Sequence, residues 1–314
     1  MVTRRDVMVA GGTLLATGPA MAASDGSPGR RAGQHGPLRF GIVADPQYAP
    51  VVPNLKSGRY YANSLWKLQE AVEAFNAEDL SFVATLGDII DRHWESFGHI
   101  MPVYDGLRHE ARFVLGNHDF DVADDYLGSV AKAARMEAPW YDFAKGDVRF
   151  IVLDGNDVSL FSTPGDSERR ALAAERLARL RETGASNAQT WNGSVGEAQM
   201  RWLDERLGAA DAAGERAIVL CHYPVFPQNE HNLWNSGELV DLALSHRSFA
   251  VWMNGHNHAG NYGELDGRHF VNFRGMVDTP DTSAYAIVTL QDDRMEIEGF
   301  GREENRTLPL APVT

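Results

Sequence analysis

Short apolar runs alternate with amphipathic stretches along most of the chain. The runs are four to seven residues long and occupy 38–44, 81–86, 112–115, 148–154, 216–221 and 249–254. Such runs are typical of buried strands. Between them, apolar residues recur with helical spacing from Tyr61 to Phe75 and again over 168–183 and 196–213. Strands that alternate with helices predict an α/β domain with a largely parallel sheet.

The C-terminal part of the chain has a different pattern. The segments "HFVNFRG", "SAYAIVTLQDD" and "RMEIEGF" are short apolar runs separated by tight turns, which predicts antiparallel strands. Residues 23–36 are rich in Gly, Ser and Pro and indicate a linker, and we find no second linker after it. We therefore predict one domain over 37–308, followed by a short tail over 309–314.

The N-terminus has the features of an export signal. Arg4 and Arg5 precede a short apolar stretch, and Ala20-Met21-Ala22 forms a small-residue cleavage site. The paired arginines resemble a twin-arginine signal. These features predict a signal peptide over 1–22 and a periplasmic location. The alternative is an unstructured tail with a chance arginine pair.

The net charge limits the classes of binding partner, and the cysteine content excludes an intrachain disulfide. The formal net charge of the 314-residue chain is −14, which argues against a nucleic-acid partner. A small anionic substrate stays compatible with this charge, because bound metal ions reverse the local field. Cys221 is the single cysteine, so no intrachain disulfide can form, and no apolar run approaches the ~20 residues of a membrane span. The oligomeric state does not follow from the sequence.

Polar side chains follow five of the predicted strands. They are Asp45 with Gln47, Asp88 with Asp91, Asn117 with His118 and Asp119, then His222, and His256 with His258. Ligands of open α/β sheets bind beyond the carboxyl ends of the strands, so these side chains are expected at one edge. A single histidine at a strand end is usually a core residue. The whole ordered set predicts a metal site.

The chemistry of two divalent ions accounts for this set. Two ions ~3.5–4 Å apart can clamp the attacking and leaving oxygens of a phosphoryl displacement. One carboxylate must bridge them, and Asp88 is the candidate. We expect the first ion to be held by Asp45, Gln47 and His258, and the second by Asn117, His222 and His256. Asp91 and Asp119 are expected to orient imidazoles.

The ordered motifs "D-x-Q", "GDIID", "GNHD", His222 and "GHNH" resemble those of the calcineurin-like metallophosphoesterases. Within that family, "GIVADPQY", "YYANSL", "WNGSVGEAQMRWL" and "LWNSGELVDLALSH" are similar to the manganese-dependent ADP-ribose/CDP-alcohol diphosphatases. The similarity runs from about Phe40 to Arg302. The predicted export signal departs from the cytosolic members of that group.

The resemblance implies a fold and a reaction. The fold is a four-layer α/β sandwich of two mixed β-sheets flanked by helices. The reaction is hydrolysis of the phosphoanhydride bond of nucleoside diphosphate derivatives, by in-line attack of a hydroxide that bridges two Mn²⁺ ions.

Gln47 occupies the position where the commonest form of the first motif has histidine. Its amide oxygen would make the shell of the first ion richer in oxygen, and oxygen ligands suit Mn²⁺ and Mg²⁺ better than Zn²⁺. The alternative is that Gln47 only hydrogen-bonds a metal-bound water molecule.

His118 is not needed as a ligand. Held by Asp119, it is expected to donate a proton to the leaving phosphate or to stabilise the transition state.

Substrate selection is expected to come from two aromatic-rich loops, 190–194 and 227–235. The candidates in them are Trp191 and Trp234 for stacking on a nucleobase, and Asn192 and His231 for binding ribose or phosphate. Near the first ligand strand, Tyr48 and Arg59 are further candidates, with Arg59 expected at the distal phosphate. For each tryptophan the alternative is packing within the loop.

Two other classes of function, a different hydrolase and a binding module, are compatible with these features. A phosphomonoesterase or a cyclic-nucleotide phosphodiesterase would use the same metal ligands, and an inactive binding module would retain the fold without turnover. A panel of substrates tested with and without metal separates the three.

Overall fold

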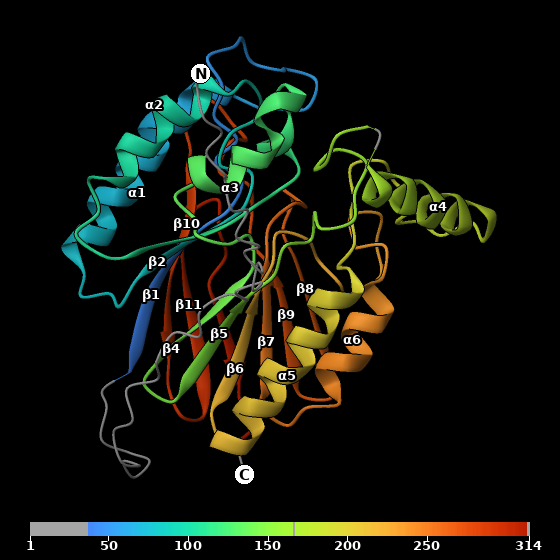
Figure 1. Ribbon diagram of the computed structural model, residues 1–314. Helices are drawn as coiled ribbons and strands as arrows, with labels where there is room; N and C mark the ends of the chain where they lie inside the picture. Colours follow the sequence, from blue (N-terminus) through green and yellow to red (C-terminus); the bar gives the residue numbers. More distant parts are fainter. Residues whose placement is uncertain (1–36, 166, 313–314) are drawn as a thin grey trace, which may run out of the picture. The chain divides into compact units, whose positions relative to one another are not determined.

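The computed structural model describes residues 37–165 and 167–312, and these residues form one compact unit (Figure 1). The predicted signal peptide and the whole of the predicted linker lie outside the described residues. Among those described, no helix is long and apolar enough to cross a membrane.

Two six-stranded sheets form the centre of the fold (Figure 1). The first has the order β12-β11-β10-β1-β2-β3, with bounds Arg306–Pro309, Arg294–Gly301, Ala284–Leu290, Leu38–Val43, Val83–Leu86 and Ala111–Val114. The second has the order β4-β5-β6-β7-β9-β8, with bounds Tyr141–Lys145, Val148–Val152, Arg216–Leu220, Phe249–Asn254, Arg268–Asn272 and Asn261–Leu265. Both sheets are mixed, because β1, β2 and β3 are parallel and β5, β6, β7 and β9 are parallel, whereas β10, β11 and β12 in the first sheet and β4 and β8 in the second pair antiparallel with their neighbours.

The two sheets pack face to face through apolar side chains. Phe40 of β1 stacks on Phe82 at 4.9 Å between ring centroids, and Phe150 of β5 meets both rings edge-on. These residues belong to one buried cluster that draws on both sheets. Such a filled interface is expected where two sheets bury their inner faces against each other.

Helices cover the outer faces (Figure 1). The helices α1 (Ser64–Ala77) and α2 (Glu95–Tyr104) lie on the first sheet, and α5 (Glu197–Ala213) and α6 (Ser236–Leu244) lie on the second. The apolar stripe predicted between Tyr61 and Phe75 is the buried face of α1. The predicted four-layer α/β sandwich is confirmed. Two further helices, α3 (Val130–Ala133) and α4 (Glu168–Glu182), lie in the connections.

The structure corrects one strand prediction. The segment "HFVNFRG" contains β9, which pairs antiparallel with β8 but parallel with β7. The β8–β9 hairpin turns the chain back into the direction of β7, and β9 takes the inner place. The elements β4, β8, β12, α2, α3 and α6 were not predicted. The strand β4 is only half-buried and shows no clear alternation.

Candidate metal centre

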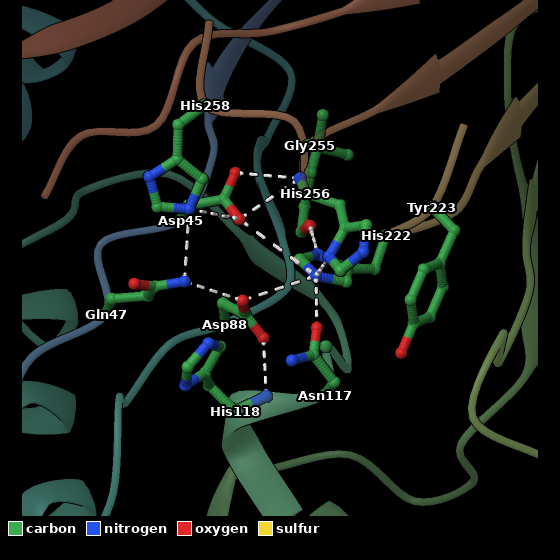
Figure 2. A network of polar contacts seen from close by, with 12 residues as sticks. Asp45, Gln47, Asp88, Asn117, His118, His222, Tyr223, Gly255, His256 and His258 are labelled. Atoms are coloured by element: carbon green, nitrogen blue, oxygen red, sulfur yellow. Dashed lines mark hydrogen bonds and ion pairs between the residues drawn. The ribbon is translucent and has the colours of Figure 1, made fainter. Parts of the chain in front are cut away.

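All seven predicted ligand residues meet at the carboxyl ends of the parallel strands (Figure 2). The Nε2 atom of His222 lies 3.3 Å from Asp88 Oδ2, 4.0 Å from Asp45 Oδ1 and 3.3 Å from Asn117 Oδ1. The Nε2 atom of His258 lies 3.6 Å from Asp45 Oδ1. Ligand atoms of Asp88, His222 and His256 all lie within 4.8 Å of one another.

The backbone of the ligand loops is strained. Asp45, Gln47, Asp88 and His256 have positive φ angles of 48°, 43°, 51° and 69°. Residues other than glycine adopt this region rarely, and such strain is concentrated at functional sites. Gly116 allows the close approach of the loops, because a Cβ atom there would lie 2.1 Å from Asp88 Oδ1. The loops are therefore held in conformations that bring the ligand side chains together.

Each imidazole is oriented by a bond from its other nitrogen. His222 Nδ1 lies 2.8 Å from the Leu86 carbonyl oxygen, and His258 Nδ1 lies 2.9 Å from Asp278 Oδ1. For His256 the outer partner is Asn192 Oδ1, 2.9 Å from Nε2, and Nδ1 lies 3.1 Å from His222 Nε2. Outer partners of this kind set the ring orientation of metal-binding histidines.

The buried charges of the site depend on one another. Burial would raise the pKa of Asp88, but His222 and His118 hold it well below its ordinary value. Burial would lower the pKa of His222, but the Asp88 carboxylate raises it to about 9. For His256, burial and the neighbouring His222 hold the pKa well below its ordinary value. Burial raises the pKa of Asp45. The site thus combines imidazole nitrogens with carboxylates away from water.

This donor set fits divalent cations. Two buried carboxylates and three imidazoles converge with the amides of Gln47 and Asn117, and carboxylate, carbonyl and imidazole are all ligands of first-row divalent ions. Asp88 lies between the two groups of ligands, 3.3 Å from His222 Nε2 and 2.8 Å from Gln47 Nε2, in the position expected of a bridging carboxylate (Figure 2).

Gln47 is oriented differently from the prediction. Its amide nitrogen, not its oxygen, faces the other ligands: Nε2 lies 2.8 Å from Asp88 Oδ2 and 3.1 Å from His258 Nε2 (Figure 2). An N–H donor pairs with a carboxylate, whereas an amide oxygen would be repelled by it. The oxygen Oε1 is buried and has no hydrogen-bond partner among the residues that the structure describes. Ligation through Oε1 requires the amide to turn over, so both predicted roles of Gln47 stay open.

The predicted contact between Asp119 and His118 is wrong. His118 Nδ1 lies 3.2 Å from the carbonyl oxygen of Asp91 and 3.2 Å from its carboxylate. Asp119 instead accepts the backbone N–H groups of Gly116 and Ile90, at 2.9 and 3.1 Å. Its carboxylate turns toward its own loop because these two buried donors need an acceptor. Asp91 therefore orients His118, and Asp119 shapes the loop.

Two of the predicted substrate residues are buried in loop packing. Trp234 is 6% exposed, packs with Val158 and Leu177, and donates from Nε1 to the Gln189 carbonyl oxygen. Asn192 is fully buried and contacts His256. Both were predicted from residue type alone, which does not separate binding from packing.

The other substrate candidates lie in different surroundings. Tyr48 is 5% exposed, and its hydroxyl lies 3.1 Å from His99 Nδ1, so its ring is part of the packing against α2 rather than a substrate wall. Trp191 is 41% exposed. His231 lies edge-on to His256 with 5.5 Å between ring centroids, and burial lowers its pKa, with smaller contributions that include Arg59. His231 therefore flanks the centre, and the backbone of Arg59 forms a β-bridge with Asp278, the partner of His258.

Two residues at the site were not predicted. Arg92 donates from Nε to Asp91, its guanidinium lies 5.6 Å from the centroid of the Tyr61 ring, and its side chain is 41% exposed. It directly follows "GDIID", and that position was the signal available for it. Asp278 orients His258 from a turn after β9, where the sequence carries no comparable motif.

Comparisons with known proteins agree with this geometry. A family model described as calcineurin-like phosphoesterase matches residues 38–260. Proteins named manganese-dependent ADP-ribose/CDP-alcohol diphosphatase are similar: that of Mus musculus is 29% identical over 86% of this chain and 92% of its own, and that of Xenopus tropicalis is 28% identical over 86% and 93%. A solved structure of a dimetal phosphatase from Danio rerio superposes with a TM-score of 0.79 at 27% identity, covering 87% of this chain and 99% of that one. The chain belongs to the calcineurin-like phosphoesterase family.

Proposed function

We propose that this protein is a metal-dependent hydrolase that cleaves the phosphoanhydride bond of nucleoside diphosphate derivatives of the ADP-ribose and CDP-alcohol class, with two divalent ions, preferably Mn²⁺. The observation that carries the proposal is the convergence of seven predicted ligand residues at the strand ends, with Asp88 between the two groups. The names of the relatives support the substrate class and the metal.

The residues of the chain have separate tasks in this reaction. Two bound ions would activate a water molecule and neutralise charge on the phosphoryl group. Asp88 would hold both ions at the spacing that in-line displacement needs. His118, anchored through Nδ1 on Asp91, has a side chain 23% exposed and keeps Nε2 free to pass a proton to the leaving phosphate.

Positive charge near the centre supports an anionic substrate. Arg92 is anchored through Nε, so the two terminal nitrogens of its guanidinium remain available for a phosphate. Arg59, whose backbone pairs with Asp278 beside His258, contributes a second cation. In a chain with a net charge of −14, these two arginines would provide the local attraction for a diphosphate.

A substrate panel tests the proposal. We expect kcat/KM with Mn²⁺ to be highest for ADP-ribose or CDP-choline, lower for a cyclic nucleotide and an aryl phosphate monoester, and negligible for each after chelation. A clear preference for the cyclic nucleotide or for a phosphomonoester would replace the diphosphatase assignment by one of the two other hydrolase functions. Absence of turnover with every substrate and metal would indicate a binding module.

The proposal includes export by the twin-arginine route, supported by Arg4, Arg5 and the cleavage site at Ala22. The double variant Arg4→Lys, Arg5→Lys keeps the charge and is expected to leave the precursor inside the cell. The measurement is the processed form in the periplasmic fraction beside the wild type. Normal processing of the double variant would contradict this route.

A further inference from the structure

Lys67 is a charged side chain in an apolar environment. It lies on the buried face of α1 between the core residues Ser64, Leu68 and Ala71, and it is fully buried. Lysine is almost never fully buried unless it is paired. Here the Nζ atom donates to the carbonyl oxygens of one turn, at 3.0 Å for Met276, 2.7 Å for Asp278 and 2.6 Å for Thr279, with that of Val277 at 3.5 Å.

The turn held by Lys67 (residues 276–279) contacts two of the three residues predicted to hold the first ion. The Asp278 carboxylate lies 2.9 Å from His258 Nδ1. The backbone N–H of Val277 donates to the carbonyl oxygen of Asp45 at 3.1 Å. A shift of this turn would therefore move the ring of His258 and the loop of Asp45 together.

The turn needs an external clamp. Its carbonyl oxygens converge on one point, where their dipoles repel one another unless a donor lies between them. Thr279 has a φ of 65°, an unfavourable backbone conformation for a β-branched residue. An ammonium group, with three donors and a full charge, satisfies this arrangement. Burial, with Arg302 nearby, lowers the pKa of Lys67 to about 8, so the amine still carries all three donors at neutral pH.

We propose that Lys67 is a positioning residue of the metal centre: by clamping the turn 276–279 it sets the position of Asp278, and through Asp278 the orientation of His258. The proposal rests on the metal-dependent function proposed above. It assigns a role to a residue that contacts neither the predicted ligands nor a substrate, and it predicts that Lys67 and Asp278 act in series.

The test measures Mn²⁺ binding to the metal-free protein by calorimetry, for Lys67→Met, Asp278→Asn and the double variant. Loss of an outer partner of a metal ligand typically weakens metal binding by 10–100-fold, so each single variant is expected to weaken the affinity of one Mn²⁺ site by at least about tenfold. Because the two residues act in series, the double variant should lose little more than the stronger single variant. Lys145→Met, at the end of β4, removes a lysine that pairs with Glu110, and this variant should bind Mn²⁺ like the wild type.

Two outcomes would overturn the inference. One is a folded Lys67→Met with a lower melting temperature but wild-type Mn²⁺ affinity, because Lys67 would then only stabilise the fold. The other is additive losses in the double variant. If Lys67→Met does not fold, the test depends on Asp278→Asn. This change leaves in place the backbone carbonyls that Lys67 binds. Wild-type Mn²⁺ affinity of Asp278→Asn would refute the proposed link from the turn to His258.

The binding measurement uses no substrate, so its result is separate from the proposed activity. Wild-type protein that binds Mn²⁺ but hydrolyses no diphosphate contradicts the proposed function alone. Wild-type protein that binds no Mn²⁺ contradicts both.

Discussion

The metal centre and the two neighbouring loops, 187–196 and 227–235, are built on different principles. At the centre, the side chains come from the ends of parallel strands, and all seven predicted ligand residues meet there. In the loops, polar and aromatic residues of similar type differ in solvent exposure: Trp191 is 41% exposed, whereas Trp234 is 6% exposed and Asn192 is fully buried.

The difference lies in how much of each position is set by the sheet. A residue directly after a parallel strand has its location determined by the strand register, so residue type and location together indicate its chemistry. The two loops instead hold each other: Trp234 N donates to the Gly193 carbonyl oxygen at 2.8 Å, and Asn187 Nδ2 donates to that of Leu233 at 2.8 Å. In such loops the same residue types serve for packing and for binding.

The variant Asp88→Asn tests the centre most strongly. It removes the charge expected to bridge the ions, so we expect kcat/KM to fall by about 10³-fold, the scale of losing a main electrostatic stabiliser. The measurement is the rate at saturating Mn²⁺, with circular dichroism to verify the fold. A variant that retains more than about a tenth of the wild-type rate would contradict a two-ion centre.

A matched pair of variants separates the roles of Asp91, which follows β2, and Asp119, which follows β3. Asp91→Asn should lower kcat by about 10²-fold, because His118 Nδ1 loses its charged carboxylate partner and keeps only neutral acceptors, including the Asp91 carbonyl oxygen. Asp119→Ala should mainly lower stability, because the Gly116 and Ile90 N–H groups lose their acceptor, at about 1–3 kcal/mol for each buried donor. Urea unfolding and kcat are measured for both. The assignment fails if Asp119→Ala loses kcat while Asp91→Asn does not.

Gln47→His tests the unusual ligand position. If Gln47 ligates the first ion through its oxygen, an imidazole should favour Zn²⁺ and lower the ratio of Mn²⁺- to Zn²⁺-supported kcat/KM by about tenfold. Selectivity should also shift from ADP-ribose toward an aryl phosphodiester. Ratios within about twofold for both substrates, well under 1 kcal/mol, would show that Gln47 does not choose the metal.

The two tryptophans provide the smallest expected effect on activity. Trp191→Ala should raise KM for ADP-ribose several-fold and change stability by no more than about 0.5 kcal/mol, because its ring is exposed. Trp234→Ala should instead destabilise the fold by about 3 kcal/mol, since it empties a packed position. Unfolding curves and KM values for both variants decide between packing and binding, and an unchanged KM for Trp191→Ala would remove it from the substrate site.

The sequence by itself indicated an α/β fold and the residues that meet at the centre, and its resemblance to a known family implied the two-sheet sandwich. Apolar runs and helical stripes located the central strands and the main helices, because period and burial are local properties of the chain. Asp45, Asp88, His222, His256 and their companions stood directly after those strands, so their meeting point followed from the parallel sheet.

Only the tertiary structure decided what each of these groups contacts. Asn192 meets His256 and Lys67 meets the turn 276–279 across 64 and about 210 residues of chain, and no local pattern encodes such pairs. The choice between Asp91 and Asp119 for His118 also depended on which buried N–H groups needed an acceptor. Side-chain contacts of this kind depend on how distant segments pack, and that packing arises only when the two sheets and their loops come together.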